Sequence, residues 1–329
     1  MIWVSWRQHR TQLLAGAAAA AIATFALYLT GMGIWSNFRG SGLAHCLTLP
    51  STDCSDVASL FSERYTNLSF LVPLFLAVPA LIGIFWGAPL VAREFEQGTQ
   101  RLAWTQGVTR VRWAGTKVAV LGAATVAITS ILTYALTWWS RPLVTAGDAR
   151  FQLGIFDLRG IVPVAYATFA LAVGVFAGVL IRRTVPAMVA SILAYAAVRA
   201  AVEFWLRPHF ARPLTIAYPI FAASPRARLG DWVVSQVTLD GSGHVLSHGA
   251  SFDLAMVGSR CPGVIPKDGS LPDKRALQAC IERIGLRVQD TYQPGTRFMT
   301  FQVIEFTIFL ALAAALIAAS LYVLRRRSG

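Results

Sequence analysis

Six long apolar stretches, separated by segments that hold most of the charge, dominate the pattern of the chain. As helices, each is long enough to cross a bilayer core of about 30 Å. Only the fifth stretch contains charged residues, Arg199 and Glu203. The pattern predicts an all-α polytopic membrane protein with six transmembrane helices, at residues 13–34, 67–91, 118–139, 161–181, 185–206 and about 306–324.

Composition supports the membrane class. Of the 329 residues, 55% are hydrophobic and 14% are charged, against about 25% charged in soluble domains. These values exclude an ordinary soluble globular protein and a disordered one. The formal net charge of +13 would suggest nucleic acid in a soluble protein. Because the basic residues here lie between apolar stretches, we expect membrane lipid and no nucleic acid as a partner.

The distribution of basic residues predicts the orientation. With the N-terminus inside, the short inner segments carry 12 Lys or Arg residues, and the much longer outer segments carry 16. This bias predicts that both termini are cytosolic. The preference for Arg over Lys is common in GC-rich bacterial genomes, so we expect a bacterial plasma membrane protein.

The cysteines test the orientation independently. Cys46 and Cys54 fall in the first expected outer loop, and Cys261 and Cys280 fall in the last. Cysteines confined to the oxidising side predict two local disulfides, 46–54 and 261–280, with four free thiols as the alternative. If the fifth stretch did not cross, the second pair would lie in the reducing cytosol, so this placement favours six spans over five.

The segment between spans five and six is too long for a simple connection. Residues 233–239 alternate as a strand does, a turn-forming run follows, and 245–246 can return as a hairpin. Residues 272–284 carry a helical apolar stripe that ends at Gly285. We therefore predict a membrane domain at 1–206, a small α+β disulfide-linked external subdomain at 207–300, and the last span with a basic cytosolic tail at 301–329.

Two other features concern the helices. Residues 1–12 suit either a short interfacial helix or a flexible basic start. Gly83 and Gly87 in the second span, and Gly174 and Gly178 in the fourth, have the spacing that lets helices approach closely.

The inner loop between spans two and three is the most informative segment. Glu94 and Glu96 precede a helix-compatible run that ends near Gly107, and acidic residues favour a helix start. A short helix beside the membrane can bind a cytosolic partner. The alternative is that the segment is an ordinary solvated loop. The segment resembles the loop of type-2 ABC-transporter permeases, a Glu-x-Glu-x-Gly-Thr pattern followed by Leu and a small-residue–Pro–x–Ser/Thr–Arg turn. The matching residues are Glu94, Glu96, Gly98, Thr99, Leu102, Thr109 and Arg110, and Gly107 stands where Pro is usual.

Two further stretches, residues 3–10 and 292–305, resemble actinobacterial members of the same group. The resemblance implies the permease subunit of an ATP-driven type-2 exporter, in which the 94–107 segment docks on a separate ATPase. It implies two ATPase copies and a second permease chain, identical or related. The residues expected to couple to the ATPase are Glu94, Glu96, Gly98, Thr99, Arg101, Leu102, Gly107 and Arg110.

Missing motifs also bear on activity. The sequence has no Gly-x-x-x-x-Gly-Lys-Ser/Thr phosphate loop and no His-Glu-x-x-His or Gly-x-Ser-x-Gly motif. We therefore expect no enzyme activity and no cofactor in this chain, with ATP and magnesium held by the partner subunit. His244 and His248, near Asp240 and Asp253, suggest an external metal site only weakly, and ordinary loop histidines are the alternative.

Charges within the spans mark a second candidate site. Arg199 and Glu203 lie one helical turn apart, and Glu305 precedes the sixth span. Buried charges often line a polar path, so these residues are candidates for a substrate path or outer gate, with a self-neutralising structural pair as the alternative. Two competing functions stay open: a sensor or assembly subunit with a ligand-binding external domain, and a membrane-embedded enzyme with its site in 207–300.

Overall fold

The computed structural model describes residues 2–49, 54–98, 109–147, 150–151, 154–222, 230–249, 254–264, 266 and 273–326. The chain forms two compact units. The membrane unit comprises Met1–Gly147, Gln152–Arg207 and Met299–Gly329, and the sheet unit comprises Asp148–Phe151 and Pro208–Phe298.

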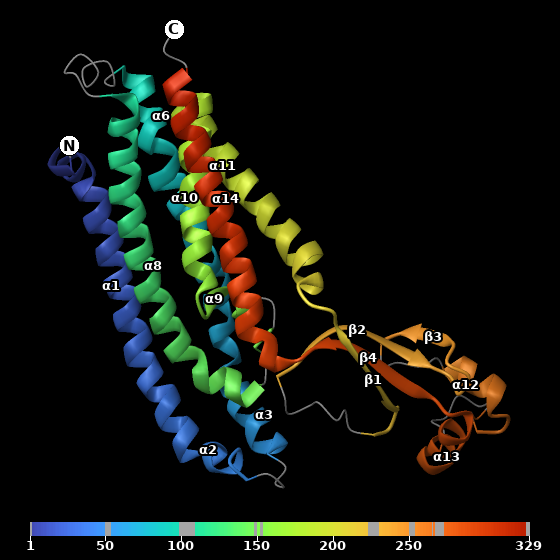
Figure 1. Cartoon of the computed structure of the whole chain (residues 1–329). Coiled ribbons are helices and arrows are strands. Elements are labelled where there is room, and N and C mark those ends of the chain that lie inside the picture. Colours follow the sequence, from blue (N-terminus) through green and yellow to red (C-terminus); the bar gives the residue numbers. More distant parts are fainter. Residues whose placement is uncertain are drawn as a thin grey trace. The chain divides into compact units, whose positions relative to one another are not determined.

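Within the described residues, six helices are long and apolar enough to cross a membrane, as the hydrophobic pattern predicts (Figure 1). The first is α1 (Ile2–Gly40), the third is α8 (Arg110–Gly147) and the fourth is α10 (Val162–Ile181). The fifth joins α11 (Thr184–Ala201), the π-helix η3 (Val202–Leu206) and the 3₁₀ turn η4 (Arg207–His209). The sixth is α14 (Phe298–Arg326), preceded by the 3₁₀ turn η5 (Gly295–Arg297).

The first helix differs from the sequence prediction. It is continuous from Ile2, so residues 2–12 form neither a separate interfacial helix nor a flexible start. The physical reason lies in the sequence, because no Gly or Pro precedes Gly16 to interrupt the helical hydrogen bonds. Helix α1 then packs along α8 (Figure 1).

The second span is broken into short pieces. It runs through η1 (Thr66–Phe70), α4 (Leu71–Leu76), α5 (Val78–Ile82), the π-helix η2 (Gly83–Gly87) and α6 (Ala88–Gln97). Pro73, Pro79 and Pro89 recur along these pieces, and each proline removes a backbone donor from the helix. Short helices α2 (Leu43–Cys46) and α3 (Ser55–Arg64) lie between the first two spans, and α9 (Ile155–Leu158) precedes α10.

Helix α10 is the most buried of the six spans, with 72% of an apolar 18-residue stretch buried inside the protein. Its glycines contact the second span directly. A Cβ on Gly87 would lie 2.7 Å from the carbonyl oxygen of Leu171 and 3.0 Å from the Cα of Gly174. The two glycine pairs therefore face each other and let the backbones touch, which is the use that their spacing predicts.

The sheet unit contains a four-stranded antiparallel sheet of order β1-β4-β2-β3. Its strands are β1 (Leu214–Pro219), β2 (Trp232–Leu239), β3 (Val245–His248) and β4 (Arg287–Gln293), and its helices are α12 (Leu254–Arg260) and α13 (Lys274–Ile284). The expected β2–β3 hairpin and the helix that ends at Gly285 are confirmed. Strands β1 and β4 were missed, because their pairing joins segments far apart in the sequence.

Candidate functional site

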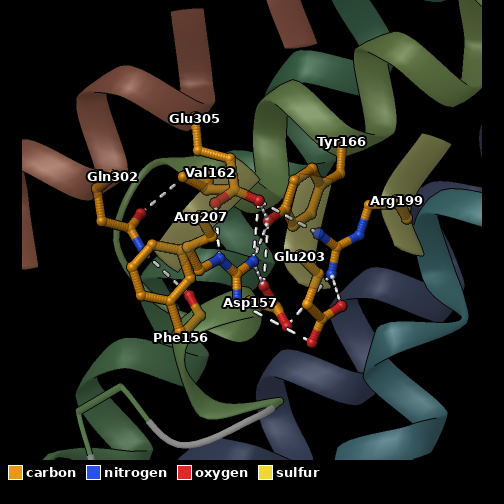
Figure 2. Close-up of polar contacts among 9 residues, drawn as sticks. All are labelled: Phe156, Asp157, Val162, Tyr166, Arg199, Glu203, Arg207, Gln302 and Glu305. Carbon is orange, nitrogen blue, oxygen red and sulfur yellow. Dashed lines mark hydrogen bonds and ion pairs between the residues drawn. The ribbon is translucent and has the colours of Figure 1, made fainter. Parts of the chain in front are cut away.

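The charged residues of the fifth and sixth spans converge inside the membrane unit. Arg199, Glu203 and Glu305 meet three residues that the sequence analysis did not select, and Figure 2 shows all six side chains pointing toward one another. We call this set the ionic cluster. Its members are Asp157 of α9, Tyr166 of α10, Arg199 of α11, Glu203 of η3, Arg207 of η4 and Glu305 of α14.

Arg207 is the most tightly held member of the ionic cluster. Its Nε donates to Glu305 Oε2 at 2.8 Å, and its Nη2 donates to Glu305 Oε1 at 2.9 Å and to Asp157 Oδ1 at 2.5 Å. This two-pronged contact with Glu305 is the strong geometry for an arginine–carboxylate pair. Arg207 is only 3% exposed, so its charge depends on these carboxylates for solvation.

Arg199 contacts all three carboxylates. Its Nη2 lies 3.2 Å from Asp157 and 3.3 Å from Glu203, and its Nη1 lies 3.3 Å from Glu305. The guanidinium carbon also lies 3.9 Å from the ring centre of Tyr166, a cation–π distance. The i, i+4 spacing of residues 199, 203 and 207 keeps these side chains on one face as the helix changes from α to π.

Asp157 and Tyr166 complete the ionic cluster. The Tyr166 hydroxyl lies 2.5 Å from Glu305 Oε1 and 3.0 Å from Asp157 Oδ1, so it can donate to either carboxylate. Burial raises the pKa of Asp157, but the guanidinium groups of Arg199 and Arg207 outweigh burial and hold that pKa below its ordinary value.

Gln302 of α14 forms hydrogen bonds with the backbone segment between Asp157 and Tyr166 and with the residue before Asp157. Its side-chain oxygen accepts hydrogen bonds from the backbone N–H groups of Ile161 and Val162, at 3.0 and 3.1 Å. Its side-chain nitrogen donates to the carbonyl oxygen of Phe156 at 3.0 Å. A single α14 residue thus satisfies backbone N–H groups at the start of α10 and a backbone carbonyl of α9 (Figure 2).

A cavity of about 400 Å³ opens beside the ionic cluster, and we call it the Glu203 cavity. One wall carries Asp157, Tyr166, Arg199 and Glu203. The rest is mostly apolar and comes from α4, α5, α8, α9, α10, α11 and η3. Its remaining lining residues are Val72, Pro73, Phe75, Leu76, Val78, Pro79, Thr129, Leu132, Thr133, Leu136, Gly154, Leu158, Pro163, Tyr195 and Phe204.

The residues expected to couple to an ATPase lie elsewhere in the membrane unit. Glu94 and Glu96 lie near the end of α6, and residues 99–107 of the helix-compatible run that they precede lie outside the described residues. The helix stops at Gly98, whose φ of 69° suits glycine, so the preceding apolar span simply extends through both glutamates. Glu94 forms a salt bridge with Lys117 of α8, which is only 2% exposed.

Glu96 has a different partner. Its Oε2 accepts from the backbone N–H of Thr184 at 3.1 Å and from the Thr184 hydroxyl at 2.6 Å, at the start of α11. Arg110 is the first residue of α8 and is partly buried. Thr99, Arg101, Leu102 and Gly107 lie outside the described residues.

Comparison with protein families matches residues 17–207 to the family described as ABC-2 membrane transporter related. The chain belongs to this family. The resemblance stated from the 94–110 pattern is therefore confirmed at the level of the family. The comparisons with curated proteins and with solved structures gave no match.

Membership in the ABC-2 family makes the chain a component of membrane transport, a class that is not itself catalytic and that works with an ABC ATPase subunit. Together with the six apolar helices, it indicates a multi-pass membrane protein. The matched region contains Glu94, Glu96 and every member of the ionic cluster except Glu305.

The remaining predicted sites of this ABC-2 protein are the two disulfides and the candidate metal site. Both disulfides are present, Cys46–Cys54 and Cys261–Cys280. Among the described residues, no group of three or more His, Cys, Asp or Glu side chains could hold a metal ion. His244 contacts the Ser242 hydroxyl at 2.9 Å, and Asp253 lies outside the described part.

The residues that sequence reasoning missed left only weak signals. Arg207 was counted with the outer loop, because it directly follows the apolar stretch at 185–206. Asp157 precedes the fourth span, and Tyr166 is one polar group in an apolar run. Nothing in their spacing indicates that three helices bring them together.

Proposed function

We propose that this chain is the permease subunit of an ATP-driven exporter in a bacterial plasma membrane, with both termini cytosolic. A separate ATPase, present in two copies, docks on the 94–107 segment, and a second permease chain completes the pathway. The supporting observation is the family match over residues 17–207 of a chain with six apolar helices.

The contacts of Glu94 and Glu96 support a route for coupling. Through Lys117 and Thr184, the end of α6 is joined to the starts of α8 and α11. A push on the loop after Gly98 would therefore act on three helices together rather than on one. On this proposal the glutamates transmit the movement, and the loop residues that follow them contact the ATPase.

The test is co-purification of the tagged chain from its native membrane in mild detergent, followed by mass spectrometry. The test variant is Arg101→Glu with Leu102→Glu, which leaves the Glu94–Lys117 and Glu96–Thr184 contacts in place. The control is Arg64→Glu with Leu60→Glu on α3, where both side chains are exposed.

We expect the wild-type chain and the control to bring down a protein with a phosphate loop, and the test variant to lose it. An ATPase that stays with the test variant would refute docking on this loop. Recovery of the wild-type chain without any ATPase, under conditions that preserve other membrane complexes, would refute the permease proposal and favour a sensor or assembly subunit.

A further inference from the structure

The Glu203 cavity has the dimensions of a ligand site. Its volume of about 400 Å³ falls in the range of pockets that hold small molecules. It combines a mostly apolar lining with a few convergent polar groups, which is the usual composition of such sites. Because all its lining residues belong to the membrane unit, a ligand there would contact that unit alone.

The charge balance at the polar wall decides which ligand fits. The ionic cluster contains three carboxylates and two guanidinium groups, so its formal charge is one negative unit. Asp157 and Glu305 have the close contacts, between 2.5 and 3.3 Å, to the two arginines and Tyr166. Glu203 has a single contact in this range, to Arg199 at 3.3 Å, so we assign the excess negative charge to this carboxylate, which has the fewest close partners.

Glu203 is the least neutralised of the three. Its ion-pair partners are Arg199 at 3.3 Å and Arg207 at 4.0 Å, and the second distance is the outer limit of an ion pair. Its side chain is 14% exposed, whereas those of Asp157 and Glu305 are 2% and 0% exposed. Glu203 also lines the cavity, which Glu305 does not. A cation that enters the cavity would therefore meet a carboxylate whose negative charge the arginines balance only in part.

Arg199 also lines the cavity, but nearby carboxylates already balance its positive charge. Its two terminal nitrogens contact Asp157, Glu203 and Glu305, and its face lies over the Tyr166 ring. An anion at this wall would have to displace one of these carboxylates. Aromatic rings at Phe75, Tyr195 and Phe204 provide further surface suited to a cation.

We propose that the Glu203 cavity binds an amphiphilic organic cation, whose charged group pairs with Glu203 and whose apolar part lies against α4 and α8. The inference deepens the proposed function, since such a cation would be the transported molecule. Binding is measurable on the permease chain alone, so its outcome is separate from the search for an ATPase.

The experiment uses two probes of the same shape and opposite charge, tetraphenylphosphonium and tetraphenylborate. Equilibrium binding of each is measured on the purified full chain in lipid nanodiscs, with empty nanodiscs subtracted. We expect saturable binding of the phosphonium and at least about tenfold weaker binding of the borate. Equal binding of both ions, preference for the borate, or no phosphonium binding would overturn the proposal.

Two variants locate the site, each with a matched control. Glu203→Gln should weaken phosphonium binding by about tenfold, and Glu63→Gln, at an exposed glutamate of α3, should not. Leu76→Trp fills the cavity from α4 and should abolish binding, while Leu74→Trp, on the same helix at a side chain 59% exposed, should leave it unchanged.

The Leu76 pair keeps the proposal testable if Glu203→Gln does not fold. Phosphonium binding that survives Leu76→Trp in a folded chain would show that the ion binds elsewhere. If binding behaves as expected but no ATPase co-purifies, the cation site stands and the exporter proposal falls. The reverse result leaves an exporter whose substrate is not a cation in this cavity.

Discussion

Glu96 caps a helix to which it does not belong: its carboxylate accepts both the backbone N–H and the hydroxyl of Thr184, the first residue of α11. Helix N-termini have free N–H groups and a positive dipole end, so a carboxylate from α6 satisfies α11 on both counts. The motif that predicts a docking surface therefore also serves the packing of the membrane unit.

The first prediction concerns this cap. Glu96→Ala should lower the melting temperature of the chain by a few degrees, and Thr184→Ala should lower it less, because the backbone N–H contact to Glu96 remains. The measurement is thermal unfolding in detergent, followed by tryptophan fluorescence. Gln97→Ala, at an exposed neighbour on α6, is the control. If Glu96→Ala and Gln97→Ala have equal stability, the cap contributes nothing.

The second prediction concerns the salt bridge between Glu94 and Lys117. Glu94→Gln leaves the ammonium of Lys117 buried without its carboxylate, and should cost about 3 kcal/mol. Lys117→Met should cost less, because the Glu94 side chain is 17% exposed and retains some water. The double variant should recover most of the loss. Urea unfolding of all four proteins as a mutant cycle measures the coupling, and strictly additive losses would contradict it.

The third prediction concerns the contact between α10 and the second span. Gly174→Ala should destabilise the chain by about 1–3 kcal/mol, because its methyl group would meet backbone atoms that cannot rotate away. Gly122→Ala on α8 is the matched control, since a Cβ there meets no atom within 4 Å. The control should be neutral or slightly stabilising. Equal melting temperatures for the two variants would show that the backbones do not touch.

The fourth prediction concerns the ionic cluster. Arg207→Gln removes the guanidinium that bridges Asp157 and Glu305, and should cost about 3–5 kcal/mol. Adding Glu305→Gln removes one uncompensated charge and should restore part of the loss. The yield of monodisperse protein and its melting temperature report both effects. A double variant less stable than Arg207→Gln alone would mean that Glu305 has another role.

The fifth prediction concerns pH and the β2–β3 turn. The Asp240 carboxylate accepts hydrogen bonds from the hydroxyl and N–H of Ser242 and from the N–H of His244, and it contacts Arg260. These contacts, led by the Ser242 hydroxyl, hold the pKa of Asp240 well below its ordinary value of 3.8. Because the folded pKa is lowered, the stabilisation is present above pH 3.8 and is lost as the pH falls toward the folded pKa.

Hydrogen–deuterium exchange of the β2–β3 amides, corrected for intrinsic rates, measures this effect in the full chain. Asp240→Asn should exchange faster than the wild type at pH 7, and the difference should narrow at about pH 3. Asp231→Asn, elsewhere in the same unit, is the control for loss of a carboxylate. A difference that is constant across pH would refute a role for the ionised Asp240.

Features that depend on local pattern could be predicted from the sequence alone. Apolar runs long enough to span a bilayer predict the six helices, and the placement of the cysteines in two expected outer loops predicts both disulfides. The apolar stripe at 272–284 and Gly285 after it predicted α13, which Gly285 ends with a φ of 70°. The 94–110 motif indicated the family without a structure, because its residues are contiguous in the sequence.

Which distant residues meet depends on how the helices and strands pack. The ionic cluster brings Asp157 and Glu305 onto one arginine from positions far apart in the chain, and no periodicity within a helix encodes that contact. The same holds for β1 with β4, and for Glu96 with Thr184. A buried charge needs a partner of opposite charge, and the packing of the helices determines which residue this is. The same packing forms the Glu203 cavity.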